Sequence, residues 1–238
     1  MFPLRDHNPT GKTPFVTWAL IALNVAIFAS YFWMPQREVA GVFDTWALHP
    51  ARISAGAELH TLVSAMFLHG GPMHILGNML FFYIFGDNLE EHFGHLGFLL
   101  FYLATGFIAS AAQIVADPAS TIPNVGASGA IAGVMGGYLL LFPKAKVDVL
   151  VVMGVITMIA VPAWTMLGLW FGLQVLSGFT TMEQTGGGVA YWAHAGGFAA
   201  GLILTAIAWI GGRKPERVAG HPAHRPTTAS PFPKVGRR

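Results

Sequence analysis

The sequence contains no cysteine among its 238 residues, and charged residues are scarce. Without cysteine the chain has no disulfide, no thiolate nucleophile and no thiolate metal ligand, so any nucleophile must be an oxygen or nitrogen group. Only 10% of the residues are charged, against about 25% in an ordinary soluble domain. With 54% hydrophobic residues and a mean hydropathy of +0.56, the composition indicates a membrane protein.

The few basic residues are unevenly placed. The net charge is only +2, and seven of the 13 lysines and arginines follow residue 212. A nucleic-acid surface needs basic side chains gathered on one folded face, so we expect no nucleic-acid partner. Because the tail 212–238 is rich in Pro and basic residues, we expect it to be disordered and to follow a membrane domain at 1–211.

Six segments are apolar over roughly the 20 residues that a helix needs to cross a bilayer. The fifth contains Pro162, which predicts a kink, a tilt or a partly re-entrant segment. The long connection 35–63 either lies in the membrane interface or forms an ordinary loop, and the sequence favours neither. The predicted fold class is all-α, a polytopic membrane protein with six transmembrane helices at 15–34, 64–86, 96–116, 125–142, 148–179 and 190–211.

The placement of Lys and Arg predicts the orientation of this bundle. Six spans put both termini on one side, which collects 11 basic residues, among them Lys144 and Lys146. The other side has only Arg37 and Arg52. By the positive-inside rule both termini are cytoplasmic. We therefore expect an integral protein of a bacterial-type inner membrane.

Polar side chains recur at one depth of the even-numbered segments, all of which run from outside to inside. Polar groups inside a span are costly and usually face a bundle interior or a water-filled cavity, so these five side chains are expected to converge on one site. His74 and Asn78, four residues apart, share a helix face, whereas His69 is expected at the mouth of the site. The five residues are His69, His74, Asn78, Ser128 and His194.

Small residues accompany the polar ones. Gly129 and Gly133 lie beside Ser128 in the fourth segment, and Gly197 and Gly201 share a helix face with His194 in the sixth. Stripes of small residues let helix backbones approach closely in membranes. We expect the two segments to pack tightly enough for the hydroxyl to meet the imidazole. The alternative is that the stripes serve packing alone and Ser128 bonds its own backbone.

A serine beside a neutral histidine allows acyl transfer, because the histidine can take the hydroxyl proton. His74, Asn78 and the backbone N–H of Ser128 could then donate to the developing oxyanion. Since no Asp or Glu lies at that depth, the pair would be a Ser-His dyad. His69 and His74 lack the i, i+4 spacing of a zinc helix, so we expect no metal and no cofactor.

Three fragments together resemble the rhomboid family of intramembrane serine proteases: HGGPMHILGN at 69–78, GASG at 126–129 and AHAGGFAAG at 193–201. The resemblance implies a six-helix bundle with Ser128 as nucleophile, His194 as base, and His74, Asn78 and the Ser128 amide as oxyanion donors. It also implies that Gly126 and Gly129 shape the serine loop, that Gly197 and Gly201 form helix contacts, and that Glu90 is structural.

One position departs from the family pattern. Many rhomboids have a tyrosine four residues after the nucleophile, whose ring packs against the catalytic imidazole, whereas this chain has Ala132. The way His194 is held is therefore an open question at the level of the sequence. The family also suggests that the fifth segment and the loop 181–192 move to admit a substrate helix.

The predicted function is that of a serine endopeptidase which cleaves transmembrane protein substrates in the lipid bilayer, within or near the outer membrane boundary. Two alternatives remain open. A transporter would also place His, Asn and Ser in a membrane, but it would usually show inverted repeats, which we do not find. An inactive rhomboid-like binder would be expected to lack Ser128 or His194, and both are present.

Overall fold

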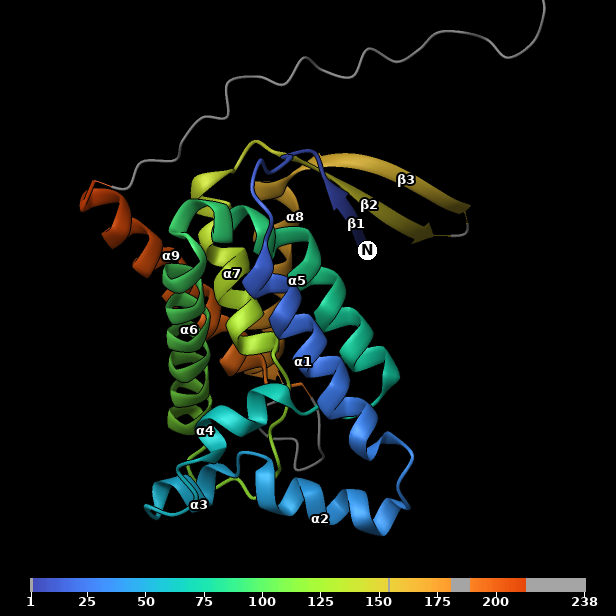
Figure 1. Ribbon diagram of the computed structural model, residues 1–238, viewed down its shortest axis with the longest axis vertical. Coiled ribbons are helices and arrows are strands. Elements are labelled where there is room, and N and C mark those ends of the chain that lie inside the picture. Colours follow the sequence, from blue (N-terminus) through green and yellow to red (C-terminus); the bar gives the residue numbers. More distant parts are fainter. Residues whose placement is uncertain (1, 154, 181–188, 213–238) are drawn as a thin grey trace, which may run out of the picture.

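A computed structural model describes residues 2–153, 155–180 and 189–212. Most of these residues are helical, and a small sheet lies at one end of the helices (Figure 1). Two of the predictions fall on residues outside the described ranges. The tail predicted to be disordered lies at 213–238, and most of the loop predicted to move lies at 181–188. The helices are α1 (Phe15–Phe32), α2 (Gln36–Trp46), α3 (Pro50–Ser54), α4 (Thr61–Ser64), the 3-10 helix η1 (Ala65–Phe67), α5 (Pro72–Phe93), α6 (His95–Ala116), α7 (Ser128–Leu141), α8 (Ala163–Thr180) and α9 (Tyr191–Ile210).

Three of the described helices, α1, α6 and α9, are long and apolar enough to cross a membrane. Their ends fall within two residues of the segments predicted at 15–34, 96–116 and 190–211. The second predicted segment is shifted, because residues 61–67 form α4 and η1, so that the long helix α5 begins only at Pro72. The connection 35–63 contains the helices α2 and α3 in place of an irregular loop.

The prediction of a single helical segment at 148–179, and with it a purely all-α fold, is wrong. Strands β1 (Phe2–Asp6), β2 (Lys146–Met153) and β3 (Val155–Pro162) form an antiparallel sheet in the order β1-β2-β3. Only the second half of the predicted segment is helical, as α8. The β2 residues Val147 and Val149 are buried, and β-branched residues in alternation suit a half-buried strand better than a helix.

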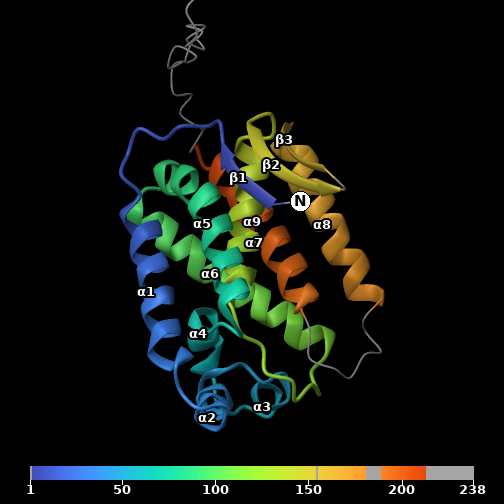
Figure 2. The ribbon, with the colours of Figure 1, turned by 90° about the vertical axis from the view of Figure 1, so that its right-hand side faces the viewer.

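The central helix of the bundle is α7, which contacts α5, α6, α8 and α9 (Figure 2). Eleven of its 14 residues are buried, and many of them are Gly or Ala. Small side chains let the surrounding helices approach its backbone. The sheet lies at the C-terminal end of α7, and α2, α3 and α4 lie at the end where α7 begins. Residues at the start of α7 therefore lie on the side opposite the sheet.

A buried carboxylate fixes the start of α1. Glu90 of α5 is 2% exposed and accepts hydrogen bonds from the backbone N–H groups of Val16 and Thr17, each at 2.8 Å. It also accepts one from the Thr17 hydroxyl at 2.7 Å and contacts Nδ1 of His95 at 2.6 Å. These N–H groups belong to the first turn of α1, which has no intrahelical acceptor for them, so Glu90 acts as a helix cap from a neighbouring helix.

Candidate active site

Ser128 is the first residue of α7 and follows a sharply bent loop. Gly126 has φ +122°, a conformation that favours glycine, and its N–H donates to the Ala65 carbonyl at 2.9 Å. The first N–H groups of a helix have no intrahelical acceptor, and among the described residues no side chain caps the start of α7. These donors lie where the serine hydroxyl stands.

His194 of α9 lies opposite this serine. Its Nε2 is 2.7 Å from the Ser128 hydroxyl oxygen, a hydrogen-bond distance. The histidine is 9% exposed and the serine is half-buried. The two side chains expected to meet across the fourth and sixth predicted segments are thus adjacent in space.

Glycines of α9 make this approach possible. A Cβ atom on Gly197 would overlap the Gly129 carbonyl, and one on Gly201 would overlap the backbone of Gly133. Any larger residue at either α9 position would push the two backbones apart.

The glycines of α7 face in another direction than the sequence suggested. The space where a side chain of Gly133 would lie is filled by Thr105 of α6, and that of Gly129 by Ala109 of α6. The backbone of Gly133 therefore contacts α9, and the absence of a side chain at Gly133 lets α6 pack close on its other side. The small residues of α7 serve two helix contacts at once.

His74 and Asn78 of α5 reach the same site across Gly126. A Cβ on Gly126 would lie 2.8 Å from Nε2 of His74 and 3.5 Å from Nδ2 of Asn78. Nδ1 of His74 accepts the Gly70 N–H at 3.2 Å, so the neutral ring carries its proton on Nε2, the atom facing the serine loop. Within the described part of the chain, Nδ2 of Asn78 is buried without a hydrogen-bond partner. Both side chains therefore hold N–H donors near Ser128.

His69 does not lie at the mouth of the site. It precedes α5, is fully buried, and its ring contacts the His74 ring at a centroid distance of 5.1 Å. Its backbone N–H donates to the Tyr31 hydroxyl at 2.7 Å, and its carbonyl accepts from the same hydroxyl at 2.9 Å. The buried His69 ring therefore packs against His74 and restricts the position of its ring.

Two side chains of α8 were missed by the sequence analysis. Oε1 of Gln174 lies 2.6 Å from Nδ1 of His194, and the Trp170 ring lies 5.7 Å from the imidazole ring. The imidazole thus has an aromatic neighbour from α8, although Ala132 supplies none. The sign in the sequence was a Gln within the apolar fifth segment, which the comparison of the even-numbered segments did not include.

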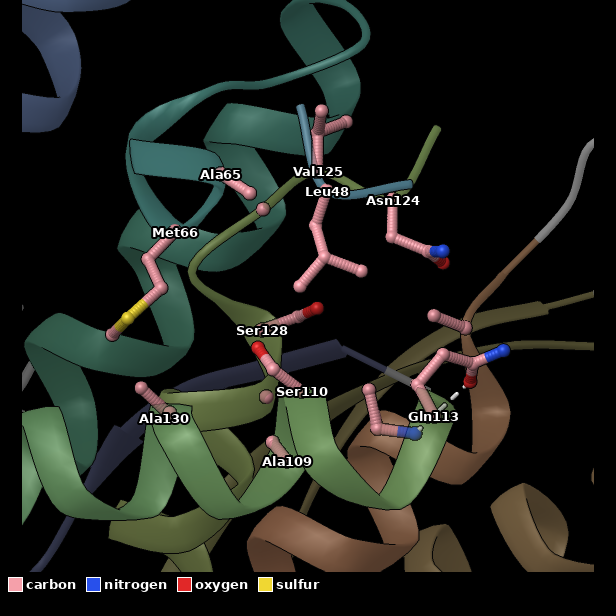
Figure 3. A pocket seen from close by; sticks show the side chains of 15 residues that line it. Leu48, Ala65, Met66, Ala109, Ser110, Gln113, Asn124, Val125, Ser128 and Ala130 are labelled. Atoms are coloured by element: carbon pink, nitrogen blue, oxygen red, sulfur yellow. Dashed lines mark hydrogen bonds between the residues drawn. The ribbon is translucent and has the colours of Figure 1, made fainter. Parts of the chain in front are cut away.

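A small pocket of about 40 Å³ opens beside Ser128, between α6 and the loop before α7 (Figure 3). Apolar side chains such as Leu48, Met66 and Ala109 line it, together with the polar Ser110 and Gln113. Gln113 also accepts the Ala193 N–H at 3.3 Å, which ties α6 to the start of α9. The volume suits a few water molecules or a small side chain.

Fold and site together define a polytopic helical membrane protein with a Ser-His pair at the start of its central helix. A family model described as Rhomboid domain matches residues 56–211, and the chain belongs to the rhomboid family. Members of this family are generally intramembrane proteases.

Several curated proteins are similar to this chain. RHOMBOID-like protein 4 of Arabidopsis thaliana is 33% identical over 154 residues, which cover 64% of this chain and 35% of that protein. Putative rhomboid protease YdcA of Bacillus subtilis is 33% identical over 128 residues, which cover 54% and 62%. Rhomboid protease GluP of the same organism is 33% identical over 132 residues, which cover 54% and 25%. The matches therefore span less than two thirds of each of these relatives.

Proposed function

We propose that this chain is an intramembrane serine endopeptidase in which Ser128 is the nucleophile and His194 the general base. The observation that carries the proposal is the 2.7 Å contact between the Ser128 hydroxyl and Nε2 of His194. The N–H donors of His74 and Asn78 lie beside Gly126, two residues before this serine. A nucleophile, its base and donors for an oxyanion are the three parts that acyl transfer requires. Two relatives named as rhomboid proteases support the same reaction class.

The chemistry would proceed in two stages. Ser128 Oγ attacks the peptide carbonyl and its proton passes to Nε2 of His194, while the carbonyl oxygen accepts from Asn78, His74 and the Ser128 N–H. The imidazolium then gives its proton to the leaving amine, and an acyl-enzyme remains on Ser128. A water molecule, deprotonated by His194, hydrolyses this ester in the second stage. The pocket beside Ser128 would supply this water or receive a small substrate side chain.

The length of α7 supports a site below the membrane surface. Its 14 residues span about 21 Å, whereas the hydrocarbon core is about 30 Å thick. If the sheet end of α7 lies at one surface, its start lies several ångströms beneath the other. We take α1, α5, α6, α7, α8 and α9 as the six spans. The helices α5 and α8 have 22 and 18 residues, and α8 exposes large apolar side chains such as Leu169 and Leu173, whereas the shorter α7 is enclosed by its neighbours.

By the positive-inside rule, the basic residues near the sheet support a cytoplasmic side for this end and for both termini; they include Arg5, Lys12, Lys144 and Lys146. The site then opens toward the outer surface. The proposed substrates are membrane proteins with a transmembrane segment, cleaved within or near their outer boundary.

The experiment is cleavage of a reporter transmembrane segment by the purified protein in liposomes. Wild type should release a product that Ser128→Ala does not, while the matched control Ser30→Ala, on the exposed side of α1, should cleave like wild type. Equal cleavage by Ser128→Ala and wild type would refute the protease function. Folding of each variant is checked by its helix content and thermal midpoint.

A further inference from the structure

Two side chains of α8 contact the His194 ring, and one of them bonds the ring nitrogen that does not face Ser128. Gln174 approaches Nδ1 at 2.6 Å, and the Trp170 ring lies 5.7 Å from the imidazole with an interplanar angle of 34°. Residues four apart share a helix face, so both side chains point the same way from α8. The imidazole is therefore bonded at Nδ1 by an amide and contacted by a tilted indole ring.

The direction of the hydrogen bond follows from its atoms. The amide oxygen of Gln174 can only accept, so Nδ1 of His194 must donate. A neutral ring with its proton on Nδ1 leaves a lone pair on Nε2, the atom 2.7 Å from the Ser128 hydroxyl. The serine can then donate its proton to Nε2, as a general base requires. With the other tautomer, Nε2 would carry a proton and could not act as the base.

An amide is a suitable acceptor at this depth. A buried carboxylate next to the imidazole would cost several kcal/mol of desolvation, whereas a neutral amide costs far less. In the described part of the chain, the side chains that hydrogen-bond the ring are Gln174 from α8 and Ser128 from α7. Among the described residues, none of the hydrogen bonds to this imidazole involves Asp or Glu.

We propose that Gln174 is a positioning residue that fixes the tautomer of His194, with the Trp170 ring packed beside the same imidazole. Gln174 thus takes the place that a carboxylate occupies in a Ser-His-Asp triad, without touching the reacting atoms. This inference rests on the proposed protease function.

The test compares Gln174→Met, which keeps the length of the side chain but removes the acceptor, with Leu173→Met on the exposed face of α8 as control. Gln174→Met should lose kcat by between roughly 10-fold and the 10⁴-fold that a wrong tautomer costs elsewhere, with KM little changed. Gln174→Glu, whose carboxylate also accepts from Nδ1 but carries the desolvation cost of a buried charge, should recover only part of the lost rate. Leu173→Met should match wild type.

A second readout does not depend on activity. In ¹⁵N-histidine-labelled protein, the His194 signal, assigned by its loss in His194→Gln, should report a proton on Nδ1 in wild type and a mixture of tautomers in Gln174→Met. An unchanged tautomer, a normal kcat, or a loss that appears in KM would each overturn the positioning role. Should Gln174→Met fail to fold, Gln174→Asn, one methylene too short, gives the same comparison. If Ser128→Ala still cleaves, the proposed function itself fails; if it is inactive while Gln174→Met is normal, only the positioning role fails.

Discussion

The contact between Gly201 and the backbone of Gly133 makes a quantitative prediction for Gly201→Ala. The added Cβ would lie 2.6 Å from the Gly133 carbonyl carbon and 2.7 Å from its Cα, whereas ordinary contacts begin at 3.4 Å. The obstacle is backbone, and the Gly133 carbonyl oxygen is nearer still, so α7 and α9 must separate by at least about 0.8 Å if the strain is relieved by translation. Carried through to the site, this shift would lengthen the bond between Ser128 and His194 from 2.7 Å to about 3.5 Å.

A displacement of this size near the reacting atoms costs on the order of 10²-fold in rate. The assay is the cleavage rate of the reporter segment by folded Gly201→Ala protein, together with its rate of labelling by a serine-directed acylating agent. The matched control is Gly168→Ala on α8, where an added Cβ meets nothing within 4 Å among the described residues. Wild-type rates for folded Gly201→Ala, or an equal loss in the control, would refute the reasoning.

Three further variants test separate parts of the structure. Asn78→Ala should lower kcat by roughly 10²- to 10³-fold with KM little changed, because one oxyanion donor is lost; a normal kcat with a raised KM would remove Asn78 from the oxyanion site. Glu90→Gln should lower the free energy of unfolding in detergent by at least about 2 kcal/mol, because the amide cannot accept all the hydrogen bonds that Glu90 accepts. The control Glu38→Gln, on the exposed part of α2, should change the free energy little. Equal thermal midpoints for the two variants would contradict the capping role of Glu90. Burial raises the pKa of Asp6 from 3.8 to about 6, although a hydrogen bond from the Tyr138 hydroxyl lowers it in part. The ionised carboxylate therefore opposes folding, and the free energy of unfolding should rise as the pH falls from about 6 to about 4. Asp6→Asn should then gain up to about 3 kcal/mol over wild type at pH 8 and nothing below pH 4, and a gain independent of pH would disprove the assignment.

The sequence predicted the apolar helices well where hydropathy alone determines the structure. Helices α1, α6 and α9 are long, uniformly apolar and exposed along one side, so their composition carries the signal. Strands β2 and β3 were missed because a strongly apolar run of Val and Ile resembles a membrane helix when only hydropathy is counted. The β-branched residues on both sides of Gly154 were the local sign of two strands.

The candidate site was predicted from residues that share a depth, and this explains which side chains the prediction groups together and which one it omits. Ser128, His194, His74 and Asn78 lie on three helices that run in one direction, so a common depth brings them near one another. Gln174 lies on α8, which runs the other way, and the same comparison passes over it. The neighbouring helix that Gly133 faces depends on the rotation of α7 about its axis. A stripe of small residues in the sequence does not determine this rotation.

The most direct test of the central claim is the cleavage rate of the reporter segment by Ser128→Ala, His194→Ala and the double variant. A hydroxyl without its base and a base without its nucleophile are equally ineffective, so all three folded proteins should be similarly inactive and the losses should not add. The account predicts rates at the uncatalysed background for each of them. Residual cleavage by Ser128→Ala well above that background, or losses that multiply in the double variant, would contradict a Ser-His dyad.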